Sequence, residues 1–441
     1  MHMKRFLFLI VAISFAAVAS RVSAETYETF PLLCDSAGFK ADEKDSFYFV
    51  HVTDIHITGS PSDNRAGNFR AFIEEVRSLS PKPAFVLITG DIVDSGQKAQ
   101  YVVLKELVDE LEKYVPVYIS LGNHDVGWNN PANGAEKFLE IFNGRKLYGS
   151  FDKAGIRFAW VFPYPSLRMR TVFGYWTDAG SLIPLDLGQE QERWLTEDIA
   201  SAGTGTLVLF FHQPPGDVFG DEMLFGLIRA LSKSPPEREV WLINGHGHAD
   251  VKWRQDLIPE GYVRCVMTSS LAYERSYRIF FAKAGRISLI ALKKLGGNFI
   301  PEPKLSGWQA RQSLFGLSRP PLLMINVPFD DTYVLDTGES VRTTSFRSIK
   351  NSSITYKVPL INGAGYFGFC VTGQYLVEIS DGETWVKIAG PARKPEYQSK
   401  RIVRIPEDAS SGETLYIRFS DPTEGDRFGM TVAWFGLFGT K

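Results

Sequence analysis

The sequence predicts an α/β domain followed by an all-β domain. From residue 47 to about residue 243, short apolar runs alternate with segments of helical spacing. This alternation is typical of a sheet with largely parallel strands. After residue 305, strand-like runs are separated by Gly, Asp, Asn and Pro turns, and no helical pattern interrupts them. With 441 residues, the chain is also long enough for two domains.

The α/β pattern begins with the apolar run 47–53, which is typical of a strand buried on both faces. Further strands are expected at 84–88, 115–119, 156–162, 206–211 and 240–243. Apolar residues at helical spacing predict helices at 69–79, 101–114 and 188–199. We therefore place this domain at residues 45–296, after a lead-in at 25–44 that has no strong periodicity.

The C-terminal part, residues 305–441, is predicted to be a β-sandwich of about eight strands. The expected strands are 322–327, 353–360, 366–371, 375–379, 385–388, 401–405, 415–419 and 430–435. The hairpin Ser380-Asp381-Gly382-x-x-Trp385 resembles those of galactose-binding-like β-sandwiches, which implies that Trp385 packs into the core. Such a domain would contact a glycan or a surface, or would be a structural module packed on the first domain.

The N-terminus has the pattern of an export signal at residues 1–24. Lys4 and Arg5 precede an apolar stretch, and the small residues Val22-Ser23-Ala24 offer a cleavage site before Glu25. The alternative is a membrane anchor, but the stretch is shorter than the ~20 residues that span a bilayer. We therefore expect a secreted or periplasmic protein with no membrane span in its mature form.

Charge and cysteine content narrow the function. The chain has 48 Lys and Arg against 50 Asp and Glu, a net charge of −2, which disfavours binding to extended nucleic acid. The three cysteines are far apart and have no metal-binding spacing, so at most one disulfide is expected.

Carboxylate, amide and imidazole side chains follow five of the expected strands. The groups are Asp54-Ile55-His56, Gly90-Asp91-Ile92-Val93-Asp94, Gly122-Asn123-His124-Asp125, His212 and Gly245-His246-Gly247-His248. Ligands of open α/β sheets bind beyond the carboxyl ends of the strands, so these groups are expected to meet. His51 lies inside the first strand and is interpreted as a satisfied core or surface histidine.

Nitrogen and oxygen ligands without thiolate suit divalent Mn, Fe or Zn. Seven candidate ligands are too many for one ion that keeps an open position, and they suit two ions that share a carboxylate. The glycines at 90, 122, 245 and 247 are expected to permit sharp turns and close backbone approach.

This ordered series of five groups resembles the calcineurin-like metallophosphoesterases over about residues 45–295. The resemblance implies a four-layer α/β/β/α sandwich with two divalent metal ions at one edge. It implies that Asp54, His56 and His248 bind one ion, and that Asn123, His212 and His246 bind the other. Asp91 would bridge the two ions, His124 would face the scissile ester, and Asp94 would orient His124.

The resemblance implies hydrolysis of phosphomonoesters or phosphodiesters by a hydroxide that bridges the ions. A protonated His124 would stabilise the developing charge or protonate the leaving oxygen. Ser95 and Asp125 stand where calcineurin-like protein phosphatases carry Arg and Glu, which disfavours protein phosphatase activity. Asp94 stands where purple acid phosphatases have a Tyr ligand, which disfavours the ferric centre of those enzymes. The match is therefore best with the branch of cyclic-nucleotide phosphodiesterase-like and general phosphohydrolases.

The substrate is expected to be a small-molecule phosphate ester. Residues 57–67, with Arg65, and residues 126–180 are expected to border the cleft, where arginine would hold a second phosphate and aromatic rings would stack on a base or sugar. The alternatives are a solvated arginine and aromatic rings packed within the loops. A different function also stays open: a surface or glycan-binding protein whose phosphoesterase domain is secondary or inactive.

Overall fold

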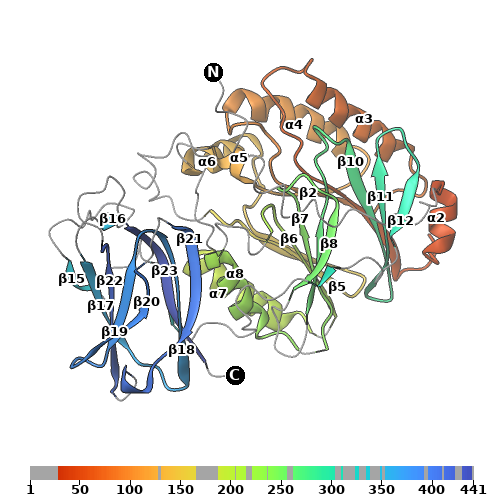
Figure 1. Cartoon of the computed structure of the whole chain (residues 1–441). Helices are drawn as coiled ribbons and strands as arrows, with labels where there is room; N and C mark the ends of the chain where they lie inside the picture. Colours follow the sequence, from red (N-terminus) through yellow and green to blue (C-terminus); the bar gives the residue numbers. More distant parts are fainter. Residues whose placement is uncertain are drawn as a thin grey trace.

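The computed structural model describes most of the chain (Figure 1). The described residues are 28–127, 131–164, 187–203, 205–214, 221–235, 237–255, 262–302, 309–310, 323–326, 334–337, 348–349, 353–391, 396–409, 412–422 and 430–439. The predicted signal at 1–24 and part of the predicted cleft loop 126–180 lie outside these residues. No helix in the described part of the chain is long and apolar enough to cross a membrane.

Two mixed sheets form the first domain. The first sheet has the order β12-β11-β10-β1-β2-β3, and the second has the order β13-β8-β9-β7-β6-β5-β4. The first contains β1 (Ser46–Val52), β2 (Val86–Thr89), β3 (Val117–Ser120), β10 (Ser276–Lys283), β11 (Arg286–Lys294) and β12 (Phe299–Glu302). The second contains β4 (Gly149–Lys153), β5 (Ile156–Trp160), β6 (Thr206–Phe210), β7 (Val240–Asn244), β8 (Val251–Gln255), β9 (Val263–Met267) and β13 (Gln309–Ala310).

Strand β1 shows how the two sheets stack. All seven of its residues are buried, as its apolar run predicts. Successive side chains of a strand point to opposite faces. Phe47 and Phe49 accordingly join the core between the two sheets, whereas Tyr48, Val50 and Val52 join the core on the helix side. The predicted four-layer arrangement follows from this burial on both faces.

Helices cover the outer faces of both sheets (Figure 1). They are α2 (Phe30–Ser36), α3 (Asn64–Ser78), α4 (Lys98–Glu112), α5 (Asn123–Val126), α6 (Pro131–Ile141), α7 (Gly188–Ser201) and α8 (Asp221–Leu231). Helix α3 begins five residues before the predicted start because Asp63 caps it: its carboxylate accepts the Arg65 N–H at 2.7 Å.

The first domain extends beyond the boundary predicted at residue 296. Strand β12 pairs with β11, and β13 pairs with β8, so residues 299–302 and 309–310 both belong to its sheets. The lead-in is also part of the fold, because Glu28 pairs with Phe299 and Leu33 of α2 is buried. The prediction placed the boundary too early because Gly296 and Gly297 form a turn between two strands, not a linker.

The C-terminal part consists of two antiparallel sheets that enclose a common hydrophobic core. One sheet contains β14 (Leu323–Asn326), β16 (Ser348–Ile349), β18 (Ala364–Gly373), β21 (Glu396–Arg404) and β23 (Met430–Gly439). The other contains β15 (Val334–Thr337), β17 (Ser353–Pro359), β19 (Leu376–Ser380), β20 (Trp385–Ala389) and β22 (Thr414–Ser420). Each of the eight predicted strands overlaps one of these; a 3₁₀ turn (Glu407–Ala409) precedes β22.

The predicted core position of Trp385 is wrong. Its side chain is only partly buried, and the Arg418 guanidinium lies over its ring, 4.1 Å from the centroid. Arg418 is held there by the Glu378 carboxylate at 2.7 Å. The aromatic ring therefore covers the outside of its sheet, and contact with a glycan stays a prediction.

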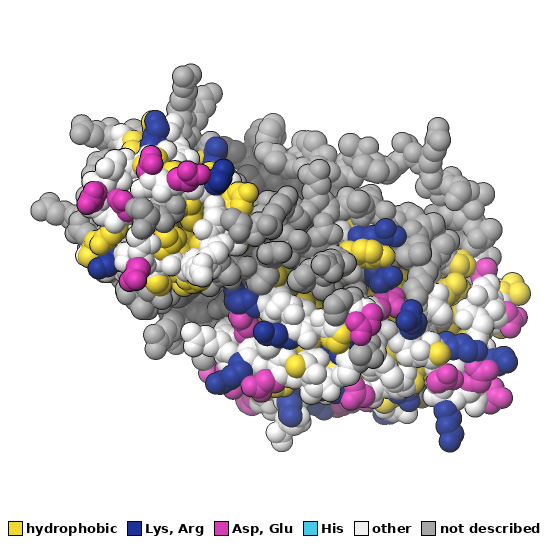
Figure 2. All heavy atoms as spheres, turned by 90° about the horizontal axis from the view of Figure 1, so that it is seen from below, with side chains coloured by type: hydrophobic (Ala, Val, Ile, Leu, Met, Phe, Trp, Pro, Cys, Tyr) yellow, Lys and Arg dark blue, Asp and Glu magenta, His cyan; other side chains and the backbone are white. Residues whose placement is uncertain are grey.

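The sheet that contains β18 and β23 packs toward α7 and α8 (Figure 1). Cys370 and Phe438 belong to the same buried cluster as Leu195 of α7 and Leu227 of α8. All three cysteines are free thiols. On the face seen in Figure 2, acidic and basic side chains are interspersed over the described part, in keeping with the nearly balanced charge.

Candidate functional site

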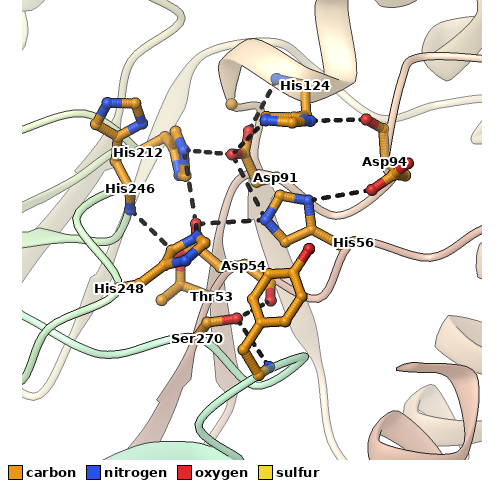
Figure 3. Close-up of polar contacts among 12 residues, drawn as sticks. Thr53, Asp54, His56, Asp91, Asp94, His124, His212, His246, His248 and Ser270 are labelled. Carbon is orange, nitrogen blue, oxygen red and sulfur yellow. Dashed lines mark hydrogen bonds and ion pairs between the residues drawn. The ribbon is translucent and has the colours of Figure 1, made fainter. Parts of the chain in front are cut away.

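Eight of the nine predicted site residues form one cluster (Figure 3). Their nitrogen and oxygen atoms fall into three groups, each within 4.8 Å: Asp54, His56 and His248; His56, Asp94 and His124; and Asp91, His212 and His246. The ninth residue, Asn123, is buried at the start of α5, next to His124. The parallel strands β1, β2 and β3 of the first sheet, and β6 and β7 of the second, deliver these residues from their carboxyl ends.

The two buried carboxylates lie close to the imidazoles. His248 Nε2 is 3.0 Å from Asp54 Oδ1, and His212 Nε2 is 3.0 Å from Asp91 Oδ2. His56 Nε2 lies between the carboxylates, 3.8 Å from Asp54 Oδ1 and 3.9 Å from Asp91 Oδ2. The cluster is therefore one continuous centre rather than separate polar contacts.

Backbone conformation sets this centre apart from the rest of the molecule. Among the described residues, eight that are not glycine have a positive φ. Five of them are predicted ligands: Asp54 (φ 52°), His56 (51°), Asp91 (46°), His246 (71°) and His248 (46°). Residues with a Cβ seldom adopt this region, and strain of this kind gathers at functional sites.

As predicted, two glycines permit close backbone approach, because a position without Cβ leaves space for the carboxylates of Asp91 and Asp54. A Cβ on Gly122 would lie 2.2 Å from Asp91 Oδ1. A Cβ on Gly245 would lie 1.9 Å from Thr53 Oγ1 and 2.5 Å from Asp54 Oδ2. Any side chain at either position would displace a predicted ligand.

The donor atoms fit divalent ions. His56 Nδ1 and Nε2, Asn123 Oδ1 and His212 Nε2 are buried without a hydrogen-bond partner, although buried polar atoms nearly always have one. His212 Nδ1 donates to the Thr89 carbonyl at 2.7 Å, so Nε2 is the nitrogen that faces the carboxylates. Histidines that bind metals are commonly held in this way through their second nitrogen.

Electrostatics keep the carboxylates ionised. Burial opposes the charge of Asp91, but His212 and the neighbouring imidazoles outweigh burial and lower the pKa of Asp91. Burial also opposes the charge of His212, yet Asp91 and Asp54 raise its pKa to about 9. For His56, burial dominates and lowers the pKa to about 4. The two carboxylates therefore favour a positive charge between them.

Asp94 contacts His124 through its backbone carbonyl and not through its carboxylate. His124 Nδ1 donates to the backbone carbonyl of Asp94 at 2.7 Å, and the ring thereby directs Nε2 toward Asp91 Oδ2, 3.9 Å away. The carboxylate of Asp94 instead pairs with Arg65 and lies 3.8 Å from His56 Nδ1. Sequence reasoning finds the residue but not which of its oxygens faces the histidine.

A buried hydrogen-bond chain supports the centre from within the sheets. His51 is fully buried and joins the hydroxyls of Thr89 and Thr268, each at 2.7 Å. The Thr89 carbonyl accepts from His212, and the Thr268 hydroxyl accepts from Arg278 at 3.0 Å. His51 is therefore a satisfied core histidine, as predicted, that also links Arg278 to a predicted ligand.

Asp125 ties two ligand loops together. Its carboxylate accepts the Val93 N–H at 2.8 Å and the Gly122 N–H at 2.7 Å, and burial beside Asp91 raises its pKa. The sequence analysis used Asp125 only to separate branches of a family. Its place three residues after Gly122, where an acidic side chain can cap α5, is the local signal for this role.

The turn after β9 is a further part of the site that sequence reasoning missed. The Ser270 hydroxyl donates to the Asp54 carbonyl at 2.8 Å (Figure 3). Tyr273, three residues on, lies with its ring centroid 5.5 Å from His56 and 5.3 Å from His248. No motif of the sequence points to this turn.

Comparison with known proteins agrees with this geometry. Residues 47–250 match the family described as calcineurin-like phosphoesterase. The protein named probable glycerophosphodiester phosphodiesterase GpdQ of Arcobacter nitrofigilis is 29% identical over 171 residues, which are 38% of this chain and 56% of that protein. The 3′,5′-cyclic-nucleotide phosphodiesterase alr5338 of Nostoc sp. is 26% identical over 181 residues, 40% of this chain and 59% of that protein.

A third relative carries a different name. Serine/threonine-protein phosphatase CPPED1 of Bos taurus is 26% identical over 191 residues, which are 40% of this chain and 56% of that protein. The chain thus spans little more than half the length of each of these relatives.

Proposed function

Because residues 47–250 match the calcineurin-like phosphoesterase family, we propose that this chain is a metal-dependent hydrolase of phosphate esters with a binuclear centre. The observation that carries the proposal is the set of buried, unpartnered donor atoms on His56, Asn123 and His212, around two ionised carboxylates. Five predicted ligands have a positive φ, which supports the proposal. Such a backbone conformation costs energy and is found mainly at functional sites.

The cluster divides into two sets of ligands around a shared carboxylate. Asp54, His56 and His248 hold one divalent ion, and Asn123, His212 and His246 hold the other, with Asp91 between them. Mn, Fe or Zn suit these nitrogen and oxygen donors. When bound, two such ions supply Lewis-acid activation of water and of the phosphate oxygens.

His124 then acts on the leaving group. Its Nδ1 is held by the Asp94 carbonyl, so a proton on Nε2 faces the centre. Water adds to phosphorus and the bond from phosphorus to the ester oxygen breaks. His124 gives its proton to that oxygen, and the proton that the water loses passes to the solvent, from which His124 is protonated again. The partly exposed rings of His124 and His248 leave this side open to substrate.

The names of the relatives support both ester classes. Two of them are phosphodiesterases, of glycerophosphodiesters and of cyclic nucleotides, and one is a protein phosphatase. We therefore propose small phosphomonoesters or phosphodiesters as substrates. Ser95 and Asp125 remain an argument against phosphoproteins. We further propose that the enzyme acts outside the cytoplasm, on the strength of the export signal at residues 1–24.

Hydrolysis of para-nitrophenyl phosphate and of its bis-ester, with Mn or Zn supplied, tests this function. We expect the wild type to hydrolyse at least one of them. His124→Ala should keep its metal content and lose about 100-fold or more in kcat, the usual contribution of general acid catalysis. Val102→Ala, at an exposed position of α4, is the matched control.

Two results would contradict the proposal. One is a metal-loaded wild type that turns over neither ester, which would favour the binding-protein alternative. The other is full activity in His124→Ala, which would remove this histidine from the reaction.

A further inference from the structure

Tyr273 is an exposed aromatic side chain at the mouth of the site. It is one of four large hydrophobic side chains that stand out as exposed among the described residues, with 51% of its surface accessible. The other three are Leu32, Val102 and Leu335. Of the four, Tyr273 is the one whose ring contacts predicted ligands, at 5.5 Å from His56 and 5.3 Å from His248. The ring therefore offers an open aromatic surface beside the polar centre.

The ring is rigidly placed by the backbone of the first ligand. Leu271 N donates to the Thr53 carbonyl, and Ala272 N donates to the Asp54 carbonyl, both at 3.1 Å. From α3, Asn68 Nδ2 donates to the Ala272 carbonyl at 3.0 Å. Because Thr53, Asp54 and Asn68 fix the backbone that leads into Tyr273, the turn loses little freedom when a ligand packs on the ring.

Arg65 supports the ring from α3. Its guanidinium lies 5.2 Å from the Tyr273 centroid, a cation–π contact. Its charge is paired with the Asp94 carboxylate, and it also donates to the His56 carbonyl at 3.2 Å. These contacts give Arg65 a role in positioning Tyr273, and its contact with a second phosphate stays a prediction.

We propose that Tyr273 is a stacking platform for the organic group of the substrate, and that the enzyme prefers phosphate esters carrying a planar aromatic ring, such as an aryl or nucleoside group. This inference rests on the proposed function and names the substrate class of the same site. The ring lies against His56 and His248, which would help to hold one ion, so a group joined to a phosphate at the centre would reach the ring directly.

Two charge-matched inhibitors separate stacking from phosphate binding. Diphenyl phosphate and dimethyl phosphate are both monoanionic diesters, and they differ in their rings. Each is measured as a competitive inhibitor of bis(4-nitrophenyl) phosphate hydrolysis by the metal-loaded enzyme. Phenyl phosphate, tested alongside, shows whether the ring serves monoesters as well.

Tyr273→Ala should raise the inhibition constant of diphenyl phosphate roughly tenfold and leave that of dimethyl phosphate unchanged. Stacking on an aromatic side chain contributes about a factor of ten or more to affinity. Tyr273→Phe should bind diphenyl phosphate as the wild type does. Val102→Ala is again the control, and the metal content of every variant shows that the centre is intact.

Equal inhibition constants for diphenyl phosphate in Tyr273→Ala and the wild type would overturn the inference, as would an equal loss for both diesters. If the wild type hydrolyses no ester, the proposed function fails by itself. Calorimetric titration of the metal-loaded wild type and Tyr273→Ala with diphenyl phosphate then still measures how much the ring contributes to binding affinity.

Discussion

His51 shows how a residue without a role in the chemistry can determine the geometry of the centre. Its two ring nitrogens hold the Thr89 and Thr268 hydroxyls, and Thr89 in turn holds His212 through its carbonyl. Neutral imidazole can donate from one nitrogen and accept at the other, which suits two hydroxyl partners. Protonation would remove the acceptor and place a charge in the core.

The stability of the fold should therefore depend on pH through His51. Burial, with the nearby Arg278 charge, lowers the pKa of His51 to about 3. Between its ordinary pKa near 6.5 and pH 3, the unfolded chain binds a proton that the folded chain does not. The stabilisation is thus complete above pH 6.5 and is lost as the pH falls, with a slope of about 1.4 kcal/mol per pH unit.

Urea unfolding of metal-free protein at pH 7, 6 and 5 measures this slope. His51→Gln keeps one donor and one acceptor and removes the titration. We expect the free energy of unfolding of the wild type to fall faster with decreasing pH than that of the variant. Parallel pH dependences would contradict a neutral buried His51.

At the same scale, the ligand residues could be predicted and the supporting residues could not. Asp54 and His212 stand directly after apolar runs, and Asn123 follows a third run within a few residues, where a strand end meets a ligand. Tyr273 reaches the centre through backbone hydrogen bonds of its turn, which any sequence can make. The carbonyl of Asp94, likewise, carries no residue-specific signal.

The turns at the strand ends are the elements that build the site. In the turn after β7, His246 and His248 both have a positive φ, and the His246 N–H donates to Asp54 Oδ2 at 3.1 Å. This bond brings the second sheet against the first sheet's ligand. It is possible because Gly245 has no Cβ between the turn and Thr53.

Gly245→Ala should separate these turns. The new methyl group would overlap the Thr53 hydroxyl at 1.9 Å, so the turn must move away from Asp54. We expect loss of bound metal and of at least 90% of activity, measured by elemental analysis and ester hydrolysis. Gly67→Ala, in α3 with no atom within 4 Å of the new Cβ, is the control. Normal metal binding in Gly245→Ala would contradict the tight contact.

Secondary structure was predictable where burial is continuous. Strands β1, β6 and β7 are buried throughout, and their apolar runs coincide with them. Strands such as β4 and β11 were not predicted, because they are partly exposed and their polar residues break the apolar run. The missing β12 led directly to the misplaced domain boundary.

At the scale of the whole molecule, the centre exists only because two sheets meet. The first sheet contributes Asp54, His56, Asp91 and Asn123, and the second contributes His212, His246 and His248. The aromatic core between them includes Phe49 of the first sheet and Phe158 of the second, whose ring centroids are 5.3 Å apart, and this packing holds the sheets together. The position of the ligand groups after successive strands predicted this convergence. No sequence pattern predicted that the C-terminal sheets pack against α7 and α8.

The central claim is that one pocket holds two ions through residues of both sheets. Elemental analysis of the purified protein, reconstituted with Mn or Zn and freed of excess metal, tests it most directly. The account predicts two ions per chain in the wild type and loss of both in Asp91→Ala, since that carboxylate lies between the two sets of ligands. One ion or none in the wild type, or two in Asp91→Ala, would contradict it.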